Sequence, residues 1–380
     1  MSARLKLAVV RQRYTPYGGA ERFIARALPA LERADVEVTL IARNWQGWRA
    51  RRVLRVDPFY LGSRWRDASF ARAARAAWLK HGFDIVQSHE RIPGCDVYRA
   101  GDGVHRHWLD VRLERAGPAE RLGIRMNPYH RYVCDAEKRM FEHPRLRAVI
   151  CNSRMVREEI LRTFRVEPAR LHVIYNGIDL EEFSPARRAA LRGPARAGIG
   201  VQPRDTVFLF VGSGFARKGL DTAIDALAQA SFPGFRLLVV GRDREAGRFA
   251  SRAERAGLAD RVRFVGAAED VRPLYAAADC LILPTRYDPF PNTVLEALAM
   301  GLPAIVSRRC GAAEIIQAGA NGWICEPDDA QGLARLMHEA DRALRDERIG
   351  AAARQSAERF GIGDMAQQLV ALYRGLVRQT

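Results

Sequence analysis

Hydrophobic residues recur along the chain in short runs, each followed by a polar or glycine-rich loop and then by apolar residues at helical spacing. This repeat of strand, loop and helix predicts parallel sheets with helices on both faces, so the predicted fold class is α/β and doubly wound. The predicted strands, with the turns that end some of them, lie within residues 5–10, 36–42, 84–89, 95–103, 148–153, 171–175, 206–211, 235–241, 262–266, 280–285 and 304–307.

The strands fall into two series, and a chain of 380 residues fits two domains of ordinary size. A turn at Asn176-Gly177-Ile178-Asp179 separates the series. We therefore predict a first domain over residues 1–180, a second over residues 181–362, and a helix over residues 363–380 that packs back on the first domain.

The segment after this turn is rich in Arg, Gly and Pro over residues 186–204, so we expect it to be a linker. The pattern of the last helix supports its packing, because its apolar side chains share one face. These side chains are Met365, Leu369, Leu372 and Leu376.

A segment from Asp288 to Pro303 carries the strongest candidate chemistry in the second domain. Helical spacing begins at Thr293, so Asn292 or Thr293 is the expected N-cap, and a helix start suits an anion such as phosphate. Glu296 lies one turn into this helix, where its carboxylate can accept two hydrogen bonds from a vicinal diol such as a ribose. The alternative is a capped helix whose acidic residue only complements the helix dipole.

A glycine-rich loop with two cations follows the predicted strand 206–211. It reads Gly212-Ser-Gly-Phe-Ala-Arg217-Lys218-Gly219, and its cations can offer a fork and a point charge to a diphosphate. The loop lacks the G-K-[ST] ending of a P-loop, and the alternative is a pair of solvated loop cations.

In the first domain, glycines and polar residues follow the predicted strands. Gly18 and Gly19 form a turn that is either a ligand approach or an ordinary tight turn, since the dinucleotide fingerprint G-x-G-x-x-G is missing. Asp102 stands between two glycines and is either a site residue or a turn residue. His89 ends another predicted strand, and His105 follows on a loop or helix.

The net charge of +17 is concentrated in the first half of the sequence. Residues 1–180 hold 34 Lys and Arg against 20 Asp and Glu, whereas the remainder holds 27 against 24. Residues 43–75 carry nine Arg among several aromatic residues, which suits an anionic membrane surface, single-stranded nucleic acid, or a plain solvated face. No run approaches the ~18 apolar residues of a membrane span, and six Cys without a C-x-x-C pair fit a reducing cytosol.

Several spaced segments together resemble the retaining glycosyltransferases of family 4, which have the GT-B fold. The matching segments are Tyr17-Gly18-Gly19, Val173-Ile-Tyr-Asn176-Gly177-Ile-Asp179 with Phe183 and Pro185, Val211–Gly219, Val265-Gly266 and Pro284–Pro303. The resemblance implies two Rossmann-like domains facing across a cleft, with a C-terminal helix that crosses back to the first domain. Within the family it extends to the glucosyltransferases of the lipopolysaccharide core.

The resemblance implies a donor site and an acceptor side. As catalytic residues it implies Asp102, Lys218, Arg217 and Asp288. As donor-binding residues it implies Gly18, Gly19, Arg217, Lys218, Gly266, Asp288, Asn292, Thr293, Val294 and Glu296. We assign His89, His105, Arg106 and Trp108 to the acceptor or membrane side. The family has Glu where this chain has Asp288, and its later loop is here Gly311-Ala312-Ala313-Glu314.

The expected reaction moves a hexose, glucose in the first instance, from a UDP-sugar to a lipopolysaccharide inner core or a similar lipid-linked or phosphorylated glycan. We expect neither a metal nor another cofactor, since no Asp-x-Asp occurs in the chain. The expected place is the cytoplasmic, anionic face of the inner membrane, without a nucleic-acid partner. Alternatives are a donor of GDP-mannose or a UDP-N-acetylhexosamine, and a non-catalytic membrane-surface protein on the same scaffold.

Overall fold

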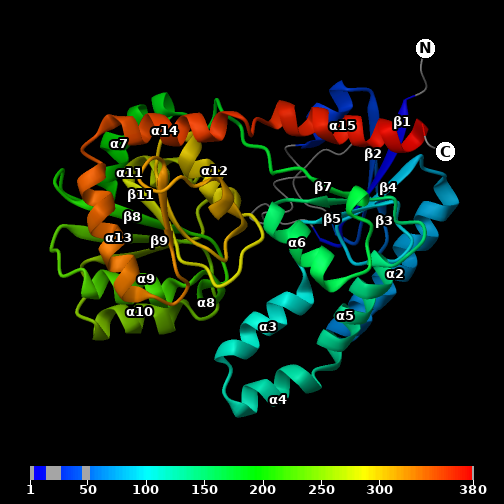
Figure 1. Cartoon of the computed structure of the whole chain (residues 1–380), viewed down its shortest axis with the longest axis horizontal. Helices are drawn as coiled ribbons and strands as arrows, with labels where there is room; N and C mark the ends of the chain where they lie inside the picture. Colours follow the sequence, from blue (N-terminus) through cyan, green and yellow to red (C-terminus); the bar gives the residue numbers. More distant parts are fainter. Residues whose placement is uncertain (1–3, 14–26, 45–51, 379–380) are drawn as a thin grey trace. The chain divides into compact units, whose positions relative to one another are not determined.

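A computed structural model describes residues 4–13, 27–44 and 52–378. The chain divides into two compact units, and each contains one parallel sheet (Figure 1). The N-terminal unit comprises the residues up to Gly177 together with those from Ile362 onward, and the C-terminal unit comprises Ile178–Gly361.

The sheet of the N-terminal unit has seven strands in the order β3-β2-β1-β4-β5-β6-β7, and every pair is parallel. Its strands are β1 (Leu5–Val10), β2 (Val36–Ala42), β3 (Val53–Arg55), β4 (Ile85–Ser88), β5 (Val97–Ala100), β6 (Ala148–Cys151) and β7 (Leu171–Val173). Its helices are α2 (Gly62–His81), α3 (His105–Arg115), α4 (Pro118–Met126), α5 (Pro128–Phe141), α6 (Arg154–Thr163) and α15 (Ile362–Arg378), with a 3-10 turn η1 (Pro168–Arg170).

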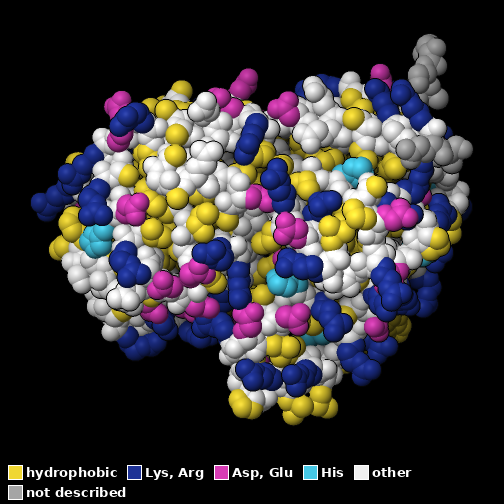
Figure 2. Space-filling model, viewed as in Figure 1, with side chains coloured by type: hydrophobic (Ala, Val, Ile, Leu, Met, Phe, Trp, Pro, Cys, Tyr) yellow, Lys and Arg dark blue, Asp and Glu magenta, His cyan; other side chains and the backbone are white. Residues whose placement is uncertain are grey.

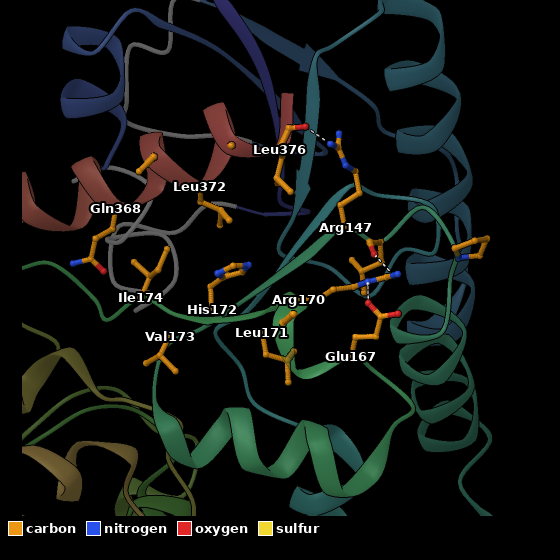
Figure 3. A pocket seen from close by; sticks show the side chains of 15 residues that line it. Arg147, Glu167, Arg170, Leu171, His172, Val173, Ile174, Gln368, Leu372 and Leu376 are labelled. Atoms are coloured by element: carbon orange, nitrogen blue, oxygen red, sulfur yellow. Dashed lines mark hydrogen bonds and ion pairs between the residues drawn. The ribbon is translucent and has the colours of Figure 1, made fainter. Parts of the chain in front are cut away.

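Alternation along β1 divides the core of this unit into two layers. Leu7 and Val9 belong to the cluster that α15 covers, whereas Ala8 and Val10 belong to the cluster that α2 covers on the other face. The apolar face of α15 contributes Met365, Leu369, Val370, Tyr373 and Leu376 to the first cluster, so the predicted packing of this helix is confirmed. A groove of about 980 Å³ remains between α15 and the edge strand β7 (Figure 3).

The sheet of the C-terminal unit has six parallel strands in the order β10-β9-β8-β11-β12-β13. Its strands are β8 (Thr206–Val211), β9 (Phe235–Val240), β10 (Val262–Gly266), β11 (Cys280–Leu283), β12 (Ala304–Ser307) and β13 (Gly322–Cys325). Its helices are α7 (Pro185–Gly198), α8 (Phe215–Lys218), α9 (Leu220–Gln229), α10 (Ala246–Arg255), α11 (Arg272–Ala277), α12 (Asn292–Ala299), α13 (Ala330–Ala343) and α14 (Glu347–Glu358), with a 3-10 turn η2 (Gly311–Ile315).

The predicted linker over residues 186–204 is wrong, because most of it is the helix α7. The hydroxyl of Ser184 accepts from the N–H of Arg187 and caps this helix, and Ala and Arg dominate its sequence. Its arginines at helical spacing, Arg188, Arg192 and Arg196, donate to the backbone carbonyls at the end of α11. Tertiary hydrogen bonds thus stabilise a helix that carries a proline in its interior.

Candidate functional site

The cation-bearing turn in the C-terminal unit depends on glycines with positive φ. Gly212 has φ +142, and a Cβ there would lie 2.5 Å from Cε of Lys218. Gly219 has φ +77, and a Cβ there would lie 2.1 Å from the carbonyl oxygen of Pro284. Only glycine therefore lets the Lys218 side chain pass across the loop and lets the turn approach the segment after β11.

Three of the predicted catalytic residues lie together in this unit. The Nζ atom of Lys218 is 2.8 Å from Oδ2 of Asp288, and NH1 of Arg217 is 3.2 Å from the same oxygen. The side chains of Lys218 and Asp288 are only 8% and 9% exposed. Burial by itself raises the pKa of Asp288, but Lys218 and Arg217 outweigh it and lower the pKa below its ordinary value.

The direction of this shift decides how the cluster responds to acid. Because the pKa of Asp288 is lower in the folded state, the ion pairs contribute stability above the ordinary carboxyl pKa. That stability is lost as the pH falls through the lowered value. At neutral pH the cluster is therefore charged, with two cations on one carboxylate.

Arg286 fixes the cation-bearing turn, and sequence reasoning did not single it out. Its guanidinium lies 2.7 Å from Oδ2 of Asp221 and 2.8 Å from Oδ1 of Asp328, and it also donates to the carbonyl of Ala216. Its backbone N–H donates to the carbonyl of Arg217 at 2.8 Å. The buried Arg286 thus binds backbone carbonyls of the turn and does not engage the side chains of Arg217 and Lys218.

The start of α12 differs from the prediction. The extended residue Pro291 occupies the N-cap position, so the predicted cap by Asn292 or Thr293 is wrong. The N–H of Val294 donates to the carbonyl of Pro291 at 3.2 Å, which occupies an amide expected to face a phosphate. The hydroxyl of Thr293 is buried without a hydrogen-bond partner among the described residues. Buried hydroxyls are normally paired, so this oxygen marks a place where a ligand can bind.

Glu296 lies one turn into α12 and is fully buried. The hydroxyl of Tyr275, on α11, donates to its Oε2 atom at 3.0 Å. Tyr275 is also fully buried, and the sequence did not single it out as a site residue. Its role depends on a contact between two helices, which no local sequence signal shows.

Glycines mark the ends of the three neighbouring strands β8, β9 and β10. The N–H of Gly241 donates to the carbonyl of Gly266 at 2.8 Å, and a Cβ on Gly241 would lie 2.0 Å from the carbonyl oxygen of Gly212. Gly266 therefore lies at the same sheet edge as the cation-bearing turn. Gly311 donates its N–H to the carbonyl of Asp288 at 2.8 Å, which places the later loop beside the same cluster. The predicted donor residues Gly18 and Gly19 lie outside the described residues.

A pocket of about 340 Å³ lies in the N-terminal unit, beyond the carboxyl ends of β1 and β4. Asp102 is on its lining and is half exposed; NH1 of Arg11 is 3.4 Å from its Oδ2 and 3.6 Å from Oε1 of Glu90. The hydroxyl of Tyr129 donates to Asp67 at 2.9 Å on the same lining. Further lining residues are Gln12, Arg13, Arg66, Phe70, Ala71, Arg91, Ile92, Tyr132, Val133 and Ala136.

The pocket lining combines four arginines with three carboxylates, so the pocket carries no large excess of one charge. Carboxylates accept and arginines donate, while tyrosines do both. Such a lining matches the many hydroxyl groups of a sugar ring better than a single multiply charged anion. Asp102 is therefore placed where an acceptor sugar could lie.

Burial lowers the pKa of both histidines assigned to the acceptor or membrane side, which favours their neutral forms. Burial, with the charges of Arg99 and Arg11, lowers the pKa of His89 well below its ordinary value. Burial, with the charge of Arg91, lowers the pKa of His105 to about 3. The Nε2 atom of His105 is 3.1 Å from Nδ1 of His130. These rings therefore add no positive charge to the unit.

Arg106 and Trp108 lie on α3 with His105, where Arg106 is exposed and Trp108 is partly buried. None of the helices among the described residues is both long and apolar enough to span a membrane. Within residues 4–13, 27–44 and 52–378, no group of three or more His, Cys, Asp and Glu side chains is arranged to hold a metal ion.

The sequence and the fold both match known glycosyltransferases. Residues 17–182 match the family model of Glycosyltransferase Family 4, and residues 194–358 match that of Glycosyl transferases group 1. The chain is 26% identical over 336 residues to the lipopolysaccharide glucosyltransferase WaaG of Escherichia coli (strain K12), across 86% of this chain and 87% of that protein. It is 29% identical over 330 residues to the lipopolysaccharide core biosynthesis glycosyltransferase LpsE of Rhizobium meliloti (strain 1021), across 86% and 87%.

The crystal structure of WaaG matches with a TM-score of 0.82 and 25% identity, over 97% of this chain and 100% of that one. Anabaena HepE in complex with UDP-glucose shares the fold, with a TM-score of 0.74 and 20% identity over 98% and 100%. The chain belongs to glycosyltransferase family 4, a family of retaining hexosyltransferases, and has the GT-B fold. The predictions of family, fold class and enzyme class are confirmed.

Proposed function

We propose that this enzyme transfers glucose from UDP-glucose to the inner core of a lipopolysaccharide or to a similar lipid-linked glycan. Similarity to WaaG and LpsE over most of their lengths supports the acceptor class. The observation that carries the proposal is the ion-pair cluster of the buried Lys218 and Asp288 with the partly exposed Arg217, a few residues before α12. Nucleotide-sugar use is common to the family.

The cluster would act on the leaving diphosphate. Cleavage of the bond between sugar and phosphate gives the sugar oxocarbenium character and leaves negative charge on the phosphate. Arg217 and Lys218 would stabilise that charge, and the unpaired hydroxyl of Thr293 would donate to a phosphate oxygen. Glu296 would accept hydrogen bonds from the ribose, and Asp288 would contact the transferred sugar.

The acceptor would bind in the pocket of the N-terminal unit. The acceptor hydroxyl that reacts would lie near Asp102, which we propose as the catalytic residue of this unit. The leaving phosphate, rather than a protein group, would receive the proton of the acceptor hydroxyl. No protein nucleophile and no metal enter this scheme.

The enzyme would lie peripherally on an anionic membrane face on the cytoplasmic side. Large apolar side chains are exposed before and at the start of α2, at Phe59, Leu61 and Trp65, and on α4 at Leu122 and Met126. Figure 2 shows apolar and basic side chains together over α4. The hydrogen bond from Tyr129 to Asp67 joins the start of α5 to α2, so both groups belong to one end of the unit. Apolar and basic side chains in combination suit an anionic lipid surface.

The test is donor turnover and binding across UDP-glucose, UDP-galactose, UDP-N-acetylglucosamine and GDP-mannose, with EDTA and no added metal. We expect selective turnover of UDP-glucose with retention at the anomeric carbon. Selective turnover of GDP-mannose or a UDP-N-acetylhexosamine would replace the proposed donor. Loss of turnover with EDTA that added Mg²⁺ restores would contradict the metal-free scheme.

A further inference from the structure

Tyr275 touches the carboxylate that the proposed function assigns to the ribose. Its hydroxyl lies 3.0 Å from Oε2 of Glu296 and 3.3 Å from the carbonyl oxygen of Thr293. We propose that Tyr275 is a positioning residue for ribose recognition: it orients Glu296, and Phe183 holds Tyr275 in place. This inference rests on the proposed function, because it requires that Glu296 binds the donor ribose.

The hydrogen-bonding capacity of the two groups supports this role. A phenol has one proton to donate, and the carboxylate is both the nearer and the charged acceptor. A carboxylate has about four acceptor positions over its two oxygens. A fixed donor on Oε2 restricts the rotation of the carboxylate, which can then present its oxygens to two adjacent hydroxyls of a ribose.

Burial makes this orientation matter. Both side chains are fully buried, so water does not compete for the hydrogen bond between them. A buried carboxylate that loses a donor is left poorly satisfied and rotates toward other partners. Because Glu296 is covered, we expect donor binding to expose one edge of it while Tyr275 continues to hold the other.

Phe183 extends this contact to the segment that follows the turn at Asn176. Its ring meets that of Tyr275 edge to face, with centroids 6.2 Å apart and planes at 85°. The backbone of Phe183 is held at both ends: its N–H donates to the carbonyl of Asp179, and its carbonyl accepts from Arg354. Through Phe183, the motif from Asn176 to Pro185 thereby acquires an indirect role in donor binding.

The experiment compares UDP with 2′,3′-dideoxy-UDP, which lacks both ribose hydroxyls, in the full-length wild type and in Tyr275→Phe. We expect the wild type to prefer UDP. In the variant we expect the dissociation constant of UDP to rise about tenfold, as for the loss of one hydrogen bond to a charged group, and that of the dideoxy analogue to change less than about twofold. The preference for UDP would then largely disappear.

Tyr373→Phe is the matched control. Tyr373 is also fully buried, and its hydroxyl donates to Oε1 of Gln87 at 2.5 Å in the N-terminal unit. This variant removes the same atom and one buried hydrogen bond, and we expect the ratio of the two dissociation constants to stay at the wild-type value. Phe183→Leu keeps an apolar side chain but removes the ring contact, and should weaken UDP alone by about threefold.

The outcomes separate the inference from the proposed function. Equal weakening of UDP and the dideoxy analogue in Tyr275→Phe would show a general structural role and overturn the inference, as would unchanged binding of both. If Tyr275→Phe fails to fold, Phe183→Leu carries the test with the same criterion. If the wild type binds UDP no more tightly than the dideoxy analogue, the proposal that Glu296 binds the ribose is contradicted. A wild type that turns over no nucleotide sugar would overturn the proposed function itself.

Discussion

The two candidate sites of this enzyme hold their charges in different ways. In the C-terminal unit Lys218 and Asp288 are both buried, and the carboxylate oxygen is within 3.2 Å of two cationic nitrogens. In the pocket of the N-terminal unit Asp102 is 49% exposed, and Arg11 stands 3.4 Å from it and 3.6 Å from Glu90. The ion pairs of the first site are shorter and its carboxylate is buried, whereas the ion pairs of the second site are longer and its Asp102 is exposed to solvent.

This difference suits two different tasks. A buried, prearranged cluster strengthens its electrostatic interactions and does not have to reorganise when charge develops, as the departure of a diphosphate requires. An exposed pocket with paired charges can exchange its hydrogen bonds with the hydroxyls of a variable glycan. Changes in the first site should therefore lower kcat, whereas changes in the second should act on the acceptor alone.

The largest effect is expected from Lys218→Ala, which removes a cation from the buried cluster. By analogy with the loss of one transition-state donor, kcat should fall by about 10²–10³-fold in steady-state measurements with the preferred donor. Lys80→Ala, at the exposed end of α2, is the matched control and should retain wild-type kinetics. Unchanged turnover in Lys218→Ala would contradict the role of the cluster in leaving-group stabilisation.

Gly212→Ala tests whether the backbone places Lys218. A Cβ at this position would lie 2.5 Å from Cε of Lys218, so the Lys218 side chain must shift from its place in the cluster. We expect kcat to fall by about 10-fold to 100-fold, because the cation is displaced rather than removed. Gly214→Ala is the control for backbone strain: its φ of +74 is also positive, but its Cβ would meet Arg217 only at 3.7 Å. If kcat falls equally in Gly212→Ala and Gly214→Ala, backbone strain alone, and not displacement of Lys218, explains the loss.

How much the sequence could predict depends on whether a feature rests on local sequence or on tertiary contacts. The β1, β2, β8, β10 and β12 strands have the predicted bounds. Four of them are largely buried apolar runs, which local composition indicates, whereas β10 is a mostly exposed edge strand. The cluster of Arg217, Lys218 and Asp288 could be predicted from the sequence because its members lie in glycine-rich and proline-rich loops after strands. A sequence therefore indicates which charged side chains follow the end of a strand.

The missed features all depend on tertiary contacts. Most of residues 186–204 form the helix α7, whose arginines reach carbonyls about ninety residues away, and composition does not show this. Arg286 and Tyr275 act through partners on other elements, and neither stands out from its neighbours in the chain. The short strand β3 was missed because its pattern lies within an arginine-rich stretch.

A smaller effect is expected from Asp102→Asn in the exposed pocket. Loss of one charge-assisted hydrogen bond to the acceptor should lower kcat/KM for the acceptor by about tenfold. Binding of UDP, measured by calorimetry, should not change, since the described residues that we propose for the donor site belong to the other unit. Asp110→Asn, exposed on α3, is the matched control. A loss of UDP affinity in Asp102→Asn would remove the distinction between the two sites.

The smallest effect per residue is expected at the end of the N-terminal unit that we propose faces the membrane. Arg64 and Arg125 are exposed near Trp65 and Met126. Each basic residue near an anionic surface contributes about 1 kcal/mol, so Arg64→Glu and Arg125→Glu should each weaken binding to anionic vesicles by about fivefold or more.

Arg335→Glu makes the same charge change on the exposed face of α13 in the C-terminal unit, and it should leave vesicle binding near the wild-type value. Wild-type binding should also weaken in 1 M salt, where screening reduces the Debye length to about 3 Å. Salt-insensitive binding that survives both reversals would indicate that the basic residues form a solvated face. The exposed pocket would then receive its acceptor without electrostatic help from the surface beside it.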